Sequence, residues 1–246
     1  MTISYSLEAI AFNIESCKIA EHAGVHRIEL CDNPGDGGTT PSMGFIKQAR
    51  KNVSIELFPI IRPRGGDFLY SPDEFEIMLN DIQLCKEIGC DGIVSGILNA
   101  DGTVDTEKTA KLAALAYPMS VTFHRAFDRT RDPFEALEKI IESGCDRILT
   151  SGQQPTAMEG AGLIKSLIEK ADNRIIIMPG SGIRSGNIKE LIQLTGAREI
   201  HTSARKSEKS KMNYINELMH ENLQSTTLDI TEVKSMINTL YSISRV

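Results

Sequence analysis

The chain has 246 residues, a formal net charge of −6 and a pI near 5.5, with 41% hydrophobic and 24% charged residues. An acidic surface does not attract nucleic acid or an anionic membrane, so neither is an expected partner. No apolar run approaches the ~20 residues that a membrane span needs, and we see no signal peptide at the N-terminus. The five cysteines include no C-x-x-C pair, which argues against a disulfide framework or a zinc ribbon and favours a cytoplasmic protein.

An internal repeat predicts the architecture. The copies are Gly24-Val-His-Arg-Ile28, Gly89-Cys-Asp-Gly-Ile93, Gly144-Cys-Asp-Arg-Ile148 and Gly196-Ala-Arg-Glu-Ile200, at spacings of 65, 55 and 52 residues. Each glycine follows a helix-like segment, where it is the expected left-handed cap, and each isoleucine lies in a strand-like one. Each interval has room for two βα units of ~30 residues or fewer. Four double units predict an α/β fold, a single (β/α)8 or TIM barrel, which typically takes ~250 residues, so we expect one domain over residues 1–246.

In chain order, the strands are expected at residues 5–11, 27–31, 54–62, 92–98, 119–125, 147–151, 175–178 and 199–203. The helices are expected at 13–22, from 40, from 71, at 105–116, from 132, at 157–170, 185–194 and 213–222. Ser71-Pro72-Asp73-Glu74 and Asp132-Pro133-Phe134-Glu135 carry the N-cap, proline and glutamate of a helix start. The barrel is expected over about residues 4–225, with an extra C-terminal helix over about 231–243.

A glycine-rich turn follows the seventh predicted strand. Gly180, Ser181 and Gly182 separate the apolar run 175–178 from a predicted helix. Barrel enzymes often bind phosphate with the loops after strands 7 and 8, and backbone N–H groups at such a turn can point at an anion. We therefore expect an anion site here, with His201 and Ser203 supplying the strand 8 half. The alternative is a tight turn that binds nothing.

Charged residues occur within the predicted strands, at positions that alternate with the repeat isoleucines. Outer strand positions of a barrel meet the helices, so the charged set is expected to point inward. Its members are Arg27, Glu29, Cys31, Arg147, Ser151, Glu199, His201 and Ser203. The lower residues Arg27, Arg147 and Glu199 are expected to form a paired polar core. Glu29, Cys31, His201 and Ser203 lie nearer the C-terminal strand ends, where barrel active sites are found, and Ser151 is a further candidate for anion binding.

Two odd-numbered strands end in further candidates. The third runs into Arg62 and Arg64, which suit fork-like binding of carboxylate or phosphate, although pairing with a loop aspartate is an equal alternative. The fifth ends at His124, with Asp128 just beyond, a plausible general acid/base group. As a hypothesis, Glu29 or His124 moves a proton on a small anionic molecule held by an arginine, and nothing selects a lyase, an isomerase or a hydrolase.

Several motifs resemble the CutC copper-homeostasis family. They are Arg27-Ile-Glu-Leu-Cys31, Gly37-Gly-Thr-Thr-Pro41, Ile61-Arg-Pro-Arg-Gly-Gly-Asp-Phe68, Phe123-His-Arg-Ala-Phe-Asp128, Ile148-Leu-Thr-Ser-Gly152 and Met178-Pro-Gly-Ser-Gly182. The resemblance extends from the first to the eighth predicted strand. It implies a cytoplasmic TIM barrel linked to the control of cellular copper, with Cu(I) held by cysteines.

This chain departs from the family pattern at one position that matters for copper. Where the family often has Leu-Glu-Val-Cys, this chain has Leu7-Glu8-Ala9-Ile10. Cu(I) prefers thiolate and thioether ligands, and Cys31 is the one cysteine expected at the active face. We therefore expect weak Cu(I) binding, if any, with Cys31 as its ligand. The competing hypothesis is an enzyme for a small anionic or phosphorylated substrate, without a physiological role in copper, and a homodimer is the expected assembly.

Overall fold

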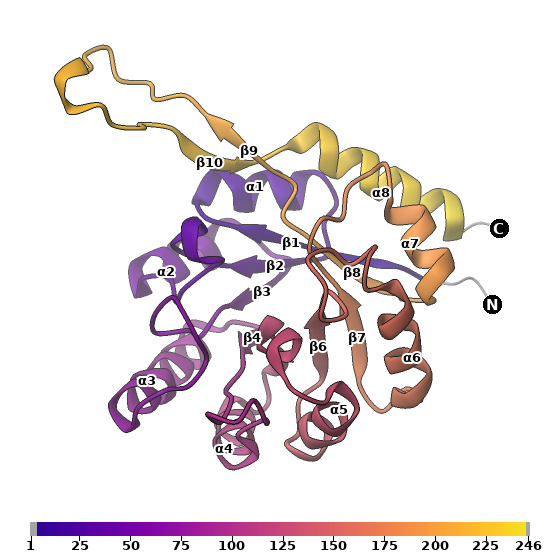
Figure 1. Cartoon of the computed structure of the whole chain (residues 1–246). Helices are drawn as coiled ribbons and strands as arrows, with labels where there is room; N and C mark the ends of the chain where they lie inside the picture. Colours follow the sequence, from indigo (N-terminus) through magenta and orange to yellow (C-terminus); the bar gives the residue numbers. More distant parts are fainter. Residues whose placement is uncertain (1–3, 245–246) are drawn as a thin grey trace.

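The structure, a computed structural model, describes residues 4–244. Parallel strands form a ring, with helices around the outside (Figure 1). The strands of the ring are β1 (Ser6–Ala11), β2 (Arg27–Leu30), β3 (Glu56–Pro59), β4 (Gly92–Ser95), β5 (Ser120–Phe123), β6 (Arg147–Thr150), β7 (Ile176–Pro179) and β8 (Glu199–Thr202). Each lies within or close to a range predicted from the sequence, so the (β/α)8 architecture is confirmed.

The strands pair as two four-stranded parallel sheets, in the orders β3-β2-β1-β8 and β4-β5-β6-β7. A parallel bridge between Ile60 and Val94 joins the sheets on one side, and the Ile61 N–H donates to the Val94 carbonyl at 2.7 Å. On the other side β7 lies next to β8. The C-terminal ends of all these strands therefore face the same end of the molecule.

The helices begin and end close to the sequence signals. They are α1 (Ile14–His22), α2 (Met43–Asn52), α3 (Pro72–Ile88), α4 (Thr106–Ala116), α5 (Pro133–Glu142), α6 (Ala161–Ala171), α7 (Ile188–Thr195) and α8 (Ile230–Ser244), with 3-10 turns η1 (Pro34–Asp36) and η2 (Arg125–Arg129). Ser71 and Glu74 form the predicted capping box of α3. The repeat glycines Gly24, Gly89, Gly144 and Gly196 all have positive φ, as the repeat predicts.

The repeat isoleucines face outward from the ring. Ile28, Ile93, Ile148 and Ile200 are fully buried in the hydrophobic cluster that also holds the inner helix faces. Because side chains alternate along a strand, the charged residues beside them must point into the ring. The sequence therefore predicted the strand register correctly.

The structure of residues 205–228 differs from the helix that the sequence predicted within them. The helix predicted at 213–222 is wrong, because this stretch belongs to a hairpin arm of β9 (Arg205–Glu208) and β10 (Ser225–Leu228) with a short 3-10 turn η3 (Glu217–Met219). The arm projects away from the ring (Figure 1). The large apolar side chains between residues 212 and 223 are exposed, Leu218 at 85%, and helices gain most of their stability from packing an apolar face. The extra C-terminal helix is confirmed as α8, which packs beside α1 and α7.

Among residues 4–244 no helix is both long enough and apolar enough to cross a membrane.

Candidate functional site

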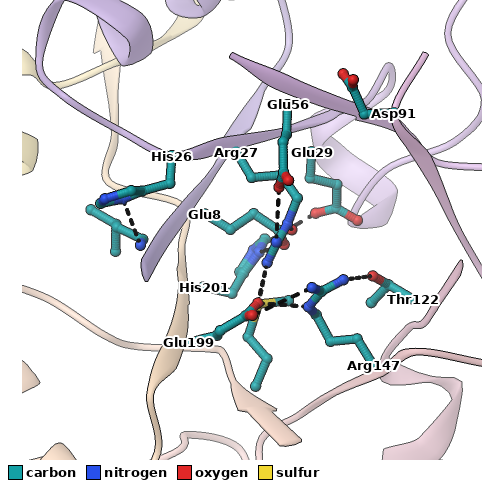
Figure 2. Close-up of polar contacts among 12 residues, drawn as sticks. Glu8, His26, Arg27, Glu29, Glu56, Asp91, Thr122, Arg147, Glu199 and His201 are labelled. Atoms are coloured by element: carbon teal, nitrogen blue, oxygen red, sulfur yellow. Dashed lines mark hydrogen bonds and ion pairs between the residues drawn. The ribbon is translucent and has the colours of Figure 1, made fainter. Parts of the chain in front are cut away.

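A fully bonded charged layer fills the lower part of the ring. Arg27 donates to Glu8 at 2.5 Å and to Glu199 at 2.6 Å, and its side chain is 3% exposed. Arg147 donates to Glu199 at 2.7 Å and to the Thr122 hydroxyl at 3.3 Å. Figure 2 shows this chain of contacts between the strands. The sequence predicted a paired polar core from Arg27, Arg147 and Glu199. The central partner, Glu8, was not among the residues predicted for this core.

Inside the ring, Glu29 is the glutamate that forms no ion pair with a guanidinium among residues 4–244. Glu8, Glu29 and Glu199 face Arg27 and Arg147, so one negative charge lacks a guanidinium partner. Within residues 4–244, the Glu29 carboxylate makes no hydrogen bond. The His201 Nε2 lies 3.7 Å from one of its oxygens. A buried unpaired charge is costly. A proton shared by Glu29 and His201 would remove the imbalance.

The pKa values of the two glutamates separate accordingly. Burial raises the pKa of both carboxyls, but Arg27 and a hydrogen bond to His201 lower that of Glu8 to about 2. For Glu29, burial dominates, the Glu8 charge adds to it, and the pKa rises to about 7. Burial opposes the charged form of His201, yet Glu8 and Glu29 raise its pKa overall. Two carboxyls with separated pKa values are typical of acid–base sites.

Glu8 also fixes the tautomer of His201. The His201 Nδ1 lies 2.7 Å from Glu8 Oε1. Because Glu8 stays ionised, it can only accept, so Nδ1 carries the proton. The Nε2 atom is then directed toward Glu29 and the mouth of the ring.

His124 lies on the opposite wall in a different state. Its Nδ1 accepts from the Ala126 N–H at 3.2 Å, which leaves the proton on Nε2. Burial and the Arg62 charge lower its pKa to about 3, so the ring stays neutral. Its Nε2 is buried and has no partner within residues 4–244. A neutral imidazole can donate a hydrogen bond at neutral pH, but it is a poor acceptor of a proton from a substrate.

The two arginines after β3 mainly hold their own loop together. Arg62 is buried and donates to the carbonyls of Asp36, Gly38 and Gly66 at 2.7–2.9 Å. Arg64 lies outside the cavity and pairs with Asp67 at 2.9 Å and Glu74 at 2.5 Å. The structure thus gives Arg64 the loop role that the sequence left as an alternative to anion binding.

Asp128 organises the loop after β6. Its carboxylate accepts from the Thr150 hydroxyl at 2.5 Å, from the Ser151 N–H at 3.0 Å and from Arg125 Nε at 2.7 Å. Ser151 in turn accepts from Arg125 Nη2 at 2.7 Å. Asp128 and Ser151 therefore hold Arg125 in position, and neither lines the cavity.

The turn after β7 contains two successive residues with a left-handed backbone. Ser181 and Gly182 both have positive φ, of 84° and 71°, which is rare for a serine and is typical of sites where a ligand is bound. Within residues 4–244 their N–H groups make no hydrogen bond. Gly180 differs, because its N–H donates to the Thr150 carbonyl at 2.9 Å.

These parts surround one cavity of about 280 Å³ at the C-terminal ends of the strands. Of the candidates named from the sequence, it is lined by Glu29, Arg62, His124, Ser181, Gly182, His201 and Ser203. Asp128, Arg64, Ser151, Gly180 and Cys31 do not line it. Its remaining wall includes Ile10, Phe12, Ile60, Phe68 and Leu149. The cavity is therefore lined by both apolar and ionisable side chains.

Arginines at the rim were missed from the sequence. Arg125 and Arg205 both line the cavity. Arg125 adjoins His124 in a motif from which only His124 and Asp128 were named as candidates. Arg205 starts β9 and donates to the Pro34 carbonyl at 3.2 Å, a contact between distant segments that no local pattern indicates.

One group of potential metal ligands occurs among residues 4–244. Glu8, Glu29 and His201 each offer an atom, all within 4.8 Å of one another. Both Glu8 oxygens are already bonded, to Arg27 and His201, so two ligands remain. Oxygen and nitrogen atoms do not suit Cu(I), which prefers sulfur. Cys31 is buried against Gly38 and Ile60, and burial raises the pKa of its thiol well above the usual value. The cavity thus does not fit Cu(I).

The fold and the site define a class: a parallel (β/α)8 barrel with a cavity at its C-terminal face that apolar and ionisable side chains line together. The model of the CutC family matches residues 5–206, which is most of the chain. The protein belongs to the CutC family. A family protein CutC of Chromobacterium violaceum is 52% identical over 208 residues, covering 85% of this chain and 84% of that protein. The copper homeostasis protein cutC homolog of Mus musculus is 44% identical over 239 residues, covering 94% and 88%.

Solved structures agree on the fold. A crystal structure of a CutC protein from Streptococcus agalactiae has a TM-score of 0.78 at 35% identity, covering 81% of this chain and 98% of that one. The aldolase QR15 has a TM-score of 0.61 at 17% identity, covering 82% and 90%. The second likeness concerns the fold alone.

Proposed function

We propose that this protein binds a small anionic molecule in the cavity and moves a proton on it, with Glu29 as the base. The observation that carries the proposal is Glu29 itself, a carboxylate without a hydrogen bond within residues 4–244, in a cavity and beside His201. Burial raises its pKa to about 7, and a base with a pKa near the working pH is the most efficient. His201 is the natural second site for the proton, because Glu8 holds its ring.

The anion half of the proposal rests on the turn after β7, which lies close to His201. The N–H groups of Ser181 and Gly182 supply uncommitted donors, and Ser203 lines the same cavity. Arg125 adds a guanidinium that Asp128 and Ser151 hold in place. A carboxylate or phosphate bound there would put the rest of a small molecule within the 280 Å³ of the cavity, facing Glu29.

Anion binding and proton transfer involve different residues, so they can be measured separately. Molecules released from the denatured protein are identified by mass spectrometry, and each is incubated with the native protein in D2O. We expect one of them to exchange a carbon-bound proton with solvent. Glu29→Gln should slow the exchange by about 10²–10⁴-fold, the usual contribution of a general base, while inorganic phosphate still binds.

Matched variants complete the test. Arg125→Gln should weaken phosphate binding, and Glu107→Gln, an exposed carboxylate on α4, should change neither binding nor exchange. Undiminished proton exchange in Glu29→Gln would remove the role assigned to that residue.

Copper is the second candidate, because relatives are named copper homeostasis proteins. The cavity ligands do not suit Cu(I), and Cys31 stands alone in an apolar cluster. Copper binding by this chain would therefore depend on sulfur atoms outside the cavity. We infer a cytoplasmic setting from the five cysteines, all free and buried thiols. The exposed apolar arm supports the expected homodimer, which light scattering can test.

A further inference from the structure

The character of the cavity lining changes around the ring. Ile10 lies in β1, Phe12 directly after it, and Ile60 directly after β3. The loops after β5, β7 and β8 contribute polar residues instead, namely Arg125, Ser181, Gly182, Ser203 and Arg205, although Leu149 of β6 also lines the cavity. Because β1, β2 and β3 are neighbours in one sheet, the three apolar residues form one wall.

Glu29 belongs to this apolar wall. In the strand register it pairs with Ile10 of β1 on one side and with Phe58 of β3 on the other. Residues directly opposite one another in a sheet point to the same face, so both apolar side chains flank the carboxylate inside the ring. An apolar setting disfavours the charged form of a carboxyl, which agrees with the pKa of Glu29 being raised by burial.

The wall is part of an apolar cluster inside the ring. The cluster consists of Ile10, Cys31, Phe58, Ile60 and Val94, with Phe12 packed against it. The residues that alternate with them, Ala9, Ala11, Leu57 and Ile61, belong to the larger core that also holds the inner helix faces. This alternation confirms that the cluster faces the interior. A ligand group that covers the wall would therefore extend an existing apolar cluster and bury more apolar surface.

The cation on this side of the lining is already occupied. Arg62 uses both Nη atoms to donate to the carbonyls of Asp36, Gly38 and Gly66, and its guanidinium lies over the Phe68 ring, 5.0 Å from the ring centroid. An anionic group at the wall would lose its hydration and face the Glu29 carboxylate, which is unfavourable. Charge and polarity thus favour an anion at the turn after β7 and a hydrocarbon group at the wall.

We propose that the ligand of the cavity is a short-chain organic anion whose hydrocarbon group packs against Ile10, Phe12 and Ile60. Its carboxylate or phosphate lies at the turn after β7 and Arg125, and its carbon atoms lie beside Glu29. The assignment rests on the proposed function and narrows it to anions that carry an apolar group. A fully polar anion gains nothing from this wall.

The test is a calorimetric titration of the full chain with two series of anions. One series is acetate, propionate, butyrate and pentanoate. The other is inorganic phosphate followed by methyl, ethyl, propyl and butyl phosphate, so that the two series also distinguish a carboxylate ligand from a phosphate ligand. In one of the series we expect the affinity to rise by about fourfold for each added CH2, the usual effect of burying a methylene group.

Variants of the wall separate packing from anion binding. Ile10→Thr and Phe12→Gln should each lower the gain per CH2 to about twofold or less, while the affinity for the shortest anion stays the same. Phe12 is partly exposed and so tolerates replacement better than buried Ile10. Ile77→Thr, which changes a 49% exposed residue of α3 outside the cavity, should behave as the wild type. Circular dichroism shows whether each variant is folded.

The results distinguish this inference from the proposed function. A wild type that binds phosphate or acetate but gains no affinity with chain length would overturn the inference alone, as would a full gain in folded Ile10→Thr and Phe12→Gln. A wild type that binds none of the anions would overturn both. Glu29→Gln should keep the gain per CH2, because the wall is intact, even though it slows proton exchange.

Discussion

The ring interior has two layers whose residue types are similar but whose contacts are not. In the lower layer, Arg27 connects Glu8 and Glu199, and the charges are paired. At the mouth, the Glu29 carboxylate makes no hydrogen bond within residues 4–244 and lies 3.7 Å from the His201 Nε2, and His124 has a buried nitrogen without a partner in the same residues. Unsatisfied buried polar groups are costly and are found where function needs them. The comparison separates residues that hold the barrel together from residues that are free to act.

The largest expected effect is in the lower layer. Arg27→Met would leave Glu8 and Glu199 without their shared partner, and removing one member of a buried ion pair typically costs about 3–5 kcal/mol. The free energy of unfolding, measured by urea denaturation, should fall by that amount. Arg64→Met is the control, because its ion pairs are partly exposed and such pairs contribute about 0–1 kcal/mol. Equal losses in the two variants would contradict the distinction between the layers.

Asp128 gives a second test of the distinction between structural and reactive residues. Its position in the sequence suggested a catalytic role, whereas its contacts indicate that it stabilises the loop. Asp128→Ala removes the acceptor of Thr150, Ser151 and Arg125. We expect a loss of about 2–3 kcal/mol in unfolding free energy, since hydrogen bonds to charged groups contribute about 1.5–3 kcal/mol each and water replaces part of them. Phosphate binding should weaken in parallel, because Arg125 loses its brace. A variant with wild-type stability would instead favour the catalytic assignment.

Much of the barrel could be predicted because local signals and core packing agree. The glycine–isoleucine repeat marked both the helix ends and the outward face of the strands, and all four isoleucines are buried as expected. The arm at 205–228 was missed because the spacing of its apolar residues resembles that of a helix. In the described structure no other element covers the apolar residues between 212 and 223, so a helix there would gain no packing. Propensity is a weak guide where packing is absent.

The site was only partly predictable, for a different reason. A position near the C-terminal end of a strand indicates that a residue such as Glu29 or His201 can reach the cavity. It does not indicate which polar groups are already bonded. Arg62 and Asp128 have suitable chemistry, but most of their polar atoms are already hydrogen-bonded. Arg62 donates to loop carbonyls, and Asp128 accepts from neighbouring donors. Glu8, near the start of the chain, fixes the His201 ring through a contact spanning 193 residues, which no single-sequence pattern reveals.

The smallest expected effect is that of Glu29 and depends on pH, and Glu8 provides the contrast. Glu29 has a folded-state pKa raised to about 7, so its protonated form favours the folded state, and its contribution to stability falls as the pH rises from about 4.5 to about 7. Glu8 has a pKa lowered to about 2, so its contribution is present above about 4.5 and is lost as the pH falls toward 2. At pH 8, Glu29→Gln should therefore stabilise the protein, by on the order of 1 kcal/mol because His201 shares the charge. Glu8→Gln should destabilise it at the same pH.

Urea denaturation of both variants at pH 5 and pH 8 measures the effect. The Glu29→Gln gain should shrink at pH 5, where the wild-type carboxyl is already protonated. A Glu29→Gln variant that loses stability at pH 8 would show that Glu29 is paired after all, and would place it with the lower layer.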